Sequence, residues 1–178
     1  MRATGIIRRI DDLGRVVIPK EIRRTMRIRE GDPLEIFTSG DGEVVLKKHS
    51  LLGAISEYAE NMAAVLHKDT GFPVAITDRD TIISVSGVPK NELLGRRVSV
   101  EIEQIMQERR TFISQQRHTV KTVEAMDVES SVCAPIIASG DIVGCICMLS
   151  AKTGEIPSDC AVKMVQIMAN FMTKSVEN

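Results

Sequence analysis

Short apolar runs bounded by turn residues fill the first 50 positions of the 178-residue chain, a pattern typical of β-strands. The turn between the first two runs ends in Gly14, which can take the positive φ that a tight hairpin needs. Pro19 suits the first position of a short helix, because it lacks the N–H that this position leaves unused. Four strands are expected, over residues 6–10, 16–18, 34–38 and 43–47, with the helix between the two hairpins.

After residue 50, longer amphipathic segments alternate with strongly apolar ones. Helices are predicted over residues 51–70 and 158–175, whereas the segment 142–149 is apolar on both faces and is expected to be a central strand. Apolar residues cover about 220° of the last helix, more than one sheet face requires, so we expect both helices to pack together and against those of another chain. The other expected elements are strands at 73–78, 81–86, 119–123 and 132–138 and a helix at 100–110.

Basic residues gather near the N-terminus. Residues 1–29 carry net +6 in a chain of net −1, and residues 1–50 carry net +3 against −4 for residues 51–178. This shift indicates two modules with different partners. At about 100° per residue, four of the basic residues share one helix face, and two more flank the first hairpin turn. Such a patch on an acidic protein favours a polyanion such as DNA. The six residues are Lys20, Arg23, Arg24, Arg27, Arg8 and Arg15.

The composition indicates a folded protein of the cytoplasm. Hydrophobic residues make up 43% of the chain. No apolar run reaches the ~18–20 residues that cross a bilayer, and the N-terminus lacks the apolar segment of a secretion signal, so no membrane partner is expected. The four cysteines follow no disulfide pattern and are expected to be reduced thiols.

The string GRVVIPKEIRR, residues 14–24, resembles the signature of AbrB-type swapped-hairpin transcription regulators, and the resemblance covers residues 3–49. In that family two chains interleave their hairpins into one small β-barrel that presents arginines from both chains to DNA. The resemblance therefore implies a dimer and double-stranded DNA as partner. It assigns the DNA contacts to Arg8, Arg15, Arg23 and Arg24, and the geometry of the patch alone adds Arg9, Lys20 and Arg27.

The string APIIASGDIVG, residues 134–144, resembles the GAF signature, in which two central strands cross a tight turn; this resemblance covers about residues 52–178. It implies a pocket whose ligand is unknown, because the Asn-Lys-x-Asp element of cyclic-nucleotide binders and the Cys-His pair of bilin binders are absent. The expected fold class is α+β. It combines an N-terminal swapped-hairpin β-barrel (residues 1–50) with a C-terminal GAF-like α/β/α domain with flanking helices (residues 51–178).

No motif of an enzyme, a cofactor or a metal site is recognised. His49, His67 and His118 are scattered, without cysteine or acidic partners at ligand spacing. The sequence contains neither of the two glycine-rich phosphate-binding loops, Walker A and G-x-G-x-x-G. Cys145 and Cys147 share one face of an apolar strand and are expected to be core residues.

Together the two modules resemble regulators that activate and repress sporulation genes in the developing spore compartment and assemble as tetramers. Three hypotheses follow. The GAF-like module senses a small molecule, or it only assembles the oligomer, or the chain is an antitoxin of a toxin–antitoxin pair. The folded, apolar C-terminal module counts against the third hypothesis, because such antitoxins usually carry a disordered acidic tail.

Overall fold

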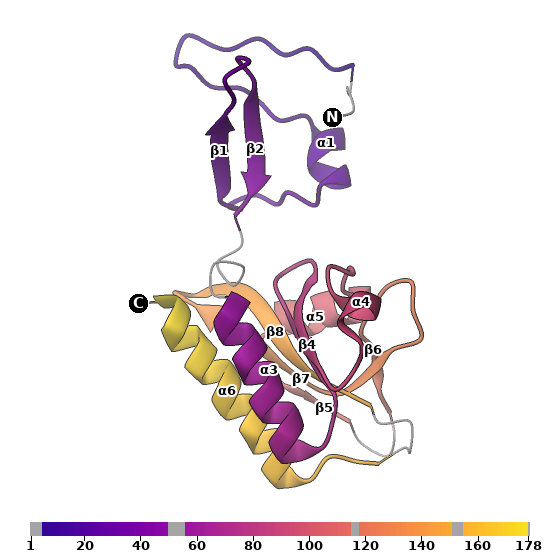
Figure 1. The fold of residues 1–178 in the computed structure, drawn as a ribbon. Helices are drawn as coiled ribbons and strands as arrows, with labels where there is room; N and C mark the ends of the chain where they lie inside the picture. The colour runs from indigo at the N-terminus through magenta and orange to yellow at the C-terminus, as the bar shows by residue number, and fades with distance from the viewer. Residues whose placement is uncertain (1–4, 50–55, 115–117, 151–154, 178) are drawn as a thin grey trace. The chain divides into compact units, whose positions relative to one another are not determined.

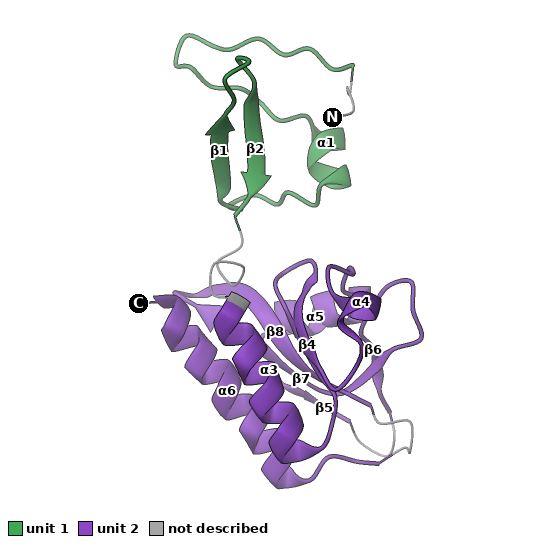
Figure 2. Cartoon of the chain, viewed as in Figure 1, with its two compact units in different colours: residues 1–49 green, residues 50–178 purple. Residues whose placement is uncertain are grey.

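A computed structural model describes residues 5–49, 56–114, 118–150 and 155–177 of the chain. The chain divides into two compact units, residues 1–49 (unit 1) and residues 50–178 (unit 2), coloured separately in Figure 2.

The described residues of unit 1 form one short helix and one two-stranded antiparallel sheet (Figure 1). Ile36 pairs with Leu46 at the centre of the sheet. The two strands agree with the predicted second hairpin to within one residue, and the helix begins where it was predicted but ends at Thr25, before Arg27. The elements are α1 (Lys20–Thr25), β1 (Leu34–Thr38) and β2 (Val44–Lys48).

The first predicted hairpin forms only its turn, and the strands predicted at 6–10 and 16–18 are wrong for the single chain. In the turn, Gly14 N donates to Asp11 O (3.0 Å) and Asp11 N donates to Arg15 O (3.1 Å), and Gly14 has the expected positive φ of 76°. Beyond the turn the two arms run as an open trace (Figure 1). They form no strand ladder with another described segment of this chain.

Unit 1 lacks a hydrophobic core of its own. No apolar side chain is buried among its described residues, and Ile7 is 90% exposed. Ile22 of α1 is half-buried, and Met26, which follows the helix, is 52% exposed. The large apolar side chains left exposed are Ile6, Ile7, Ile10, Leu13, Val16, Val17, Met26, Ile36, Phe37, Val44 and Leu46.

Unit 2 is built on an antiparallel sheet with the strand order β4-β3-β8-β7-β5, and β6 also pairs with β7. β8 lies inside this order, as predicted from its two apolar faces, and Ala134 of β7 pairs with its Ile146. The strands are β3 (Val74–Thr77), β4 (Ile82–Ser86), β5 (Phe112–Ile113), β6 (Val120–Lys121), β7 (Glu129–Ala138) and β8 (Asp141–Leu149).

Helices cover both faces of this sheet. α3 (Ser56–Thr70) and α6 (Asp159–Glu177) lie side by side over one face, and their buried residues share a core with Ile76, Ile146 and Val132 (Figure 1). α4 (Lys90–Leu93) and α5 (Val100–Glu108) pack on the other face. The predicted α/β/α layering of the second module is therefore confirmed.

Two short elements of unit 2 were missed from the sequence, which indicated a loop for α4 and nothing for β5. The other strands and helices lie where the periodicity placed them, with ends that shift by a few residues at most in the described segments. The first five predicted residues of α3 lie outside the described residues.

Gly87 provides a test of packing in unit 2. It has a φ of +82°, and a Cβ there would lie 2.6 Å from His67 Cε1 and 2.9 Å from Pro73 Cα. His67 cannot easily retreat, because its Nδ1 lies 2.9 Å from the Phe72 carbonyl oxygen that accepts its hydrogen bond. We expect Gly87→Ala to lower the free energy of unfolding by about 2–4 kcal/mol, measured by urea denaturation.

Gly71→Ala is the matched control. Gly71 also has a positive φ, 77°, but a Cβ there would meet no atom within 4 Å. We expect it to cost only about 1 kcal/mol, the strain of the left-handed backbone. Equal losses for the two variants would show that the contacts around Gly87 do not constrain the fold.

Candidate nucleic-acid interface

Six of the seven predicted DNA-contacting residues are exposed on unit 1. Arg8 and Arg9 lie on the first open arm, and Arg15 lies at the end of the turn. α1 carries the other three, which are Lys20, Arg23 and Arg24. The six therefore come from two structural elements, the turn with its arm and the helix, as the sequence predicted.

The helical placement of Arg27 is wrong. α1 ends at Thr25, and Arg27 adopts the left-handed conformation with φ of 51°. Ile28 N donates to Arg23 O (2.8 Å) and Arg27 N to Arg24 O (3.3 Å), the paired bonds of a Schellman motif that ends a helix. Arg27 is also half-buried. Helical periodicity thus gives no reason to place its guanidinium beside those of Arg23 and Arg24.

Lys48 fixes the end of α1 to the second hairpin. Its Nζ donates to the carbonyl oxygen of Arg27 (3.0 Å) and lies 3.3 Å from Asp32 Oδ2. The Asp32 carboxylate, whose side chain is 1% exposed, also accepts from Arg29 N (2.8 Å). These bonds tie the segment that directly follows α1 to β2, whereas α1 itself has no buried residue and no side-chain N-cap.

Asp11 holds the turn that carries Arg15. Its Oδ1 accepts from Leu13 N (3.0 Å) and Arg15 N (2.8 Å), and its Oδ2 accepts from Arg15 Nε (2.7 Å). Hydrogen bonds from the Arg15 backbone and then its guanidinium hold the pKa of Asp11 below its usual range. The sequence analysis missed Asp11 and Lys48. Asp at the first position of a turn that closes on Gly was the available signal for Asp11.

The sheet face below α5 is filled by side chains. Ile102 and Met106 of α5 pack with Leu93, Val98 and Leu149 in one buried cluster. This face of the sheet therefore forms part of the hydrophobic core of unit 2.

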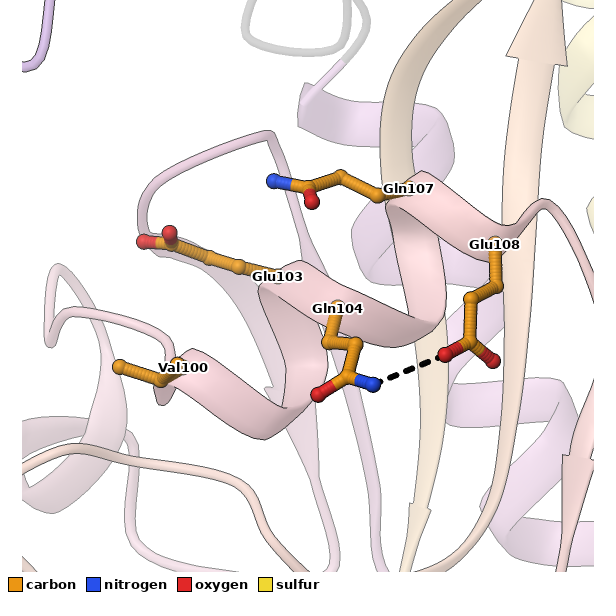
Figure 3. A pocket seen from close by; sticks show the side chains of 5 residues that line it. All are labelled: Val100, Glu103, Gln104, Gln107 and Glu108. Atoms are coloured by element: carbon orange, nitrogen blue, oxygen red, sulfur yellow. Dashed lines mark hydrogen bonds between the residues drawn. The ribbon is translucent and has the colours of Figure 1, made fainter.

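The outer face of α5 forms an open hollow, lined by side chains from that single helix (Figure 3). Gln104 Nε2 donates to Glu108 Oε1 (2.9 Å) across it. The lining residues are Val100, Glu103, Gln104, Gln107 and Glu108. Since no second element contributes a side chain, the hollow has no convergent set of groups that would fix a small ligand.

Cys133, Cys145 and Cys147 form a buried thiol cluster on β7 and β8. Cys133 pairs with Cys147 in the sheet register, and the Cys147 and Cys145 sulfurs are 3.8 Å apart. Burial raises the pKa of the Cys133 and Cys145 thiols. Hydrogen bonds from these two thiols lower the pKa of Cys147. The predicted core placement of Cys145 and Cys147 is confirmed.

Neither metal binding nor membrane insertion finds support in the described residues. No group of three or more His, Cys, Asp and Glu side chains in this part of the chain is arranged to hold a metal ion. None of its helices combines the length and the apolar composition needed to span a bilayer.

Two families match the chain. The family described as "Stage V sporulation protein T C-terminal, transcription factor" matches residues 54–177. The family described as "Antidote-toxin recognition MazE, bacterial antitoxin" matches residues 7–51.

Two proteins of Bacillus subtilis (strain 168) are similar to this chain. Stage V sporulation protein T is 44% identical over 181 residues, which cover 99% of each chain. The transition state regulatory protein AbrB is 55% identical over 49 residues, which cover 28% of this chain and 50% of AbrB. The resemblance of the N-terminal module to AbrB is therefore confirmed.

Among solved structures, the GAF domain/HD domain protein from Geobacter sulfurreducens matches with a TM-score of 0.51 at 12% identity. The match covers 72% of this chain and 99% of that one. At this identity the likeness shows the fold alone, and it confirms the GAF-like fold predicted for the second module.

The four cysteines should differ sharply in reactivity. Cys160 is exposed in the first turn of α6, whereas the three thiols of the buried cluster are inaccessible. Iodoacetamide should therefore modify one thiol per folded chain and all four after denaturation, as counted by intact-mass spectrometry.

Cys160→Ser is the control for this labelling, and it should abolish the rapid modification of the folded protein. Rapid modification of any cysteine in the buried cluster would show that the face of the sheet below α5 opens in solution.

Proposed function

We propose that this chain, which belongs to the family of stage V sporulation protein T, is a DNA-binding regulator that activates and represses transcription of sporulation genes. The observation that carries the proposal is the set of exposed basic side chains on the AbrB-like unit 1. The family's description as a transcription factor supports it and gives no reason to expect an enzyme. Such a regulator acts in the cytoplasm, and by the same likeness in the developing spore compartment.

The proposal includes a dimer in which two chains interleave the arms of their first hairpins. The arms carry strand-forming residues without a strand partner in the described part of the chain. Exposed apolar side chains of unit 1, such as Ile7 and Val17, would become buried in such a barrel. Each side chain of this size contributes about 1.5–3 kcal/mol when it is fully buried. A dimer would also double the set of arginines offered to DNA.

Unit 2 would join two such dimers into a tetramer. α6 buries Val165 and Met172 against the sheet but leaves Ile167 63% exposed and Phe171 54% exposed. On the neighbouring α3, Tyr58 is 59% exposed. These side chains offer an apolar surface that a helix pair of another chain could cover.

DNA binding would be driven mainly by contacts between basic side chains and DNA phosphates. Each basic residue that contacts a phosphate releases condensed counterions, so the affinity should fall steeply with salt. Two linked dimers would hold two DNA segments and gain avidity without new contacts. A small molecule bound to unit 2 could change DNA binding only if it favoured one arrangement of the helices over another. Without such a ligand, unit 2 would act as an assembly module only.

Toxin neutralisation is a second candidate function, favoured by the match of residues 7–51 to the MazE family. The two functions place different demands on the C-terminal part of the chain. An antitoxin needs an extended segment that folds on its toxin. The chain from α3 to α6 instead already folds into a sheet whose two faces are covered by helices. Transcription regulation is therefore the better supported function.

Arg23→Ala and Arg24→Ala test the interface. Each should lower the affinity for duplex DNA by at least about tenfold, because every dimer loses two contacts. The slope of log affinity against log salt should become shallower by about one unit per lost phosphate contact. Fluorescence anisotropy across a salt series measures both quantities.

Lys47→Ala is the matched control for these two variants. It removes one exposed positive charge from the same unit, on β2 rather than α1, where Lys47 lies 4.7 Å above the Phe37 ring centre. We expect a loss of less than about threefold, the effect of net charge alone. Wild-type affinity in both arginine variants would contradict the proposed interface.

Phe171→Glu together with Ile167→Glu tests the role of α6. The buried charges should split the tetramer into dimers, because two carboxylates cannot be desolvated in an apolar interface without partners. Native mass spectrometry would report the subunit count. Asn170→Glu adds a negative charge to the same helix without replacing an apolar side chain, and it should leave the tetramer intact. An unchanged tetramer in the double variant would exclude this surface as the interface.

A further inference from the structure

We propose that Asp11 is a positioning residue for DNA recognition: it holds the Arg15 guanidinium so that its two terminal nitrogens face the DNA. This inference rests on the proposed function, since it takes Arg15 to be a DNA contact. It adds a role for an acidic residue that neither the charge pattern nor the helix geometry of the basic patch indicated.

The contacts of Asp11 separate into two sets that use different oxygens. Oδ1 accepts from the backbone N–H groups of Leu13 and Arg15, at 3.0 and 2.8 Å, and thereby closes the turn. Oδ2 accepts from Arg15 Nε at 2.7 Å. One oxygen therefore shapes the backbone, while the other fixes the direction of the guanidinium.

This geometry leaves the useful edge of Arg15 free for DNA. A guanidinium carries five N–H donors in a planar fork, and Asp11 occupies only the one on Nε. The two terminal nitrogens are the pair that binds O6 and N7 of guanine, or two phosphate oxygens, in a bidentate manner. The Arg15 side chain is 69% exposed, so this edge is accessible in the single chain.

The arrangement is local and does not depend on a partner chain. All of its bonds lie within the five residues from Asp11 to Arg15, including the backbone bonds Gly14 N to Asp11 O and Asp11 N to Arg15 O. The same turn would therefore be kept when the arms pair with those of a second chain. Holding Arg15 before DNA arrives reduces the side-chain entropy that binding would otherwise cost.

The negative charge of Asp11 allows its proposed role to be distinguished from a simple charge effect. A carboxylate beside DNA repels phosphates, so removal of an acidic residue from this surface should tighten binding by a small factor. The side chain of Asp12, the neighbouring acidic residue, makes no hydrogen bond or ion pair among the described residues and should follow this rule. Removal of the Asp11 carboxylate should instead weaken DNA binding, because it also releases the Arg15 guanidinium.

The experiment compares Asp11→Asn with Asp12→Asn in the full-length protein. The asparagine at position 11 keeps an oxygen for the two backbone N–H groups but removes the charged acceptor of Arg15 Nε. The probes are a duplex selected by the wild-type protein from a random-sequence library and a scrambled duplex of the same composition. The readout is the ratio of the two affinities at fixed salt.

We expect Asp12→Asn to tighten both complexes by a similar factor and leave the ratio unchanged. Asp11→Asn should weaken the complex with the selected duplex by about fivefold, the loss of one solvent-exposed ion pair. It should leave the complex with the scrambled duplex unchanged or tighter. Equal behaviour of the two variants would overturn the role of Asp11.

Arg15→Ala, alone and combined with Asp11→Asn, completes the test. If Arg15→Ala lowers the affinity ratio and the double variant lowers it no further, Asp11 acts through Arg15. A further fall in the double variant would overturn the proposal, because a general loss of structure reduces binding in both backgrounds. Wild-type affinity for Arg15→Ala would instead remove Arg15 from the proposed interface. An effect of Arg15→Ala without one of Asp11→Asn would overturn only the inference on Asp11.

Discussion

The inability of unit 1 to bury its own apolar side chains is the constraint on which the proposed function depends. A module of fewer than 50 residues has little interior to offer, and here no apolar side chain of its described residues is buried. The two arms of the first hairpin carry strand-forming residues but no strand ladder among the described elements. The arms of a second chain would supply both the strand partners and the cover for the exposed apolar side chains. Folding of unit 1 and dimerisation would then be one process.

This coupling explains why the basic residues are spread over two elements. Arg15 lies at a turn that forms locally, whereas Arg23 and Arg24 lie on a helix without buried residues, and only the segment that follows this helix is tied to β2 through Lys48. The turn arginine can be oriented before the chains meet. The helix arginines instead rely on the packing that a dimer would complete.

The sequence was most informative where one chain alone determines the structure. β8 was predicted as a central strand because both of its faces are apolar, and α6 because its amphipathic period extends over many turns. α4 and β5 were missed because elements of four and two residues contain no period to detect. The arms at 6–18 have the composition of strands, but the pairing that would make them strands is not provided within the described chain.

The candidate nucleic-acid interface could also be predicted only in part. Arg8, Arg15, Arg23 and Arg24 were recognisable from a sequence motif, and all are exposed. Arg27 was misplaced because helical periodicity continues past Thr25, whereas the backbone turns into a left-handed conformation at Arg27 itself. Asp11 was overlooked because charge counting treats an acidic residue as a cost to DNA binding. Only the bond from Arg15 Nε to Asp11 Oδ2 shows what its carboxylate contributes.

Unit 2 supplies what unit 1 lacks, which is a complete core within one chain. Its sheet is covered by α3 and α6 on one face and by α4 and α5 on the other, so the core of this unit is formed within one chain. If its exposed α6 surface brings chains together, the attached N-terminal units meet at a high effective concentration. Association through unit 2 would then already cover most of the entropy cost of bringing two N-terminal units together. We infer that a GAF-like domain without a ligand could control DNA binding in this way, through assembly alone.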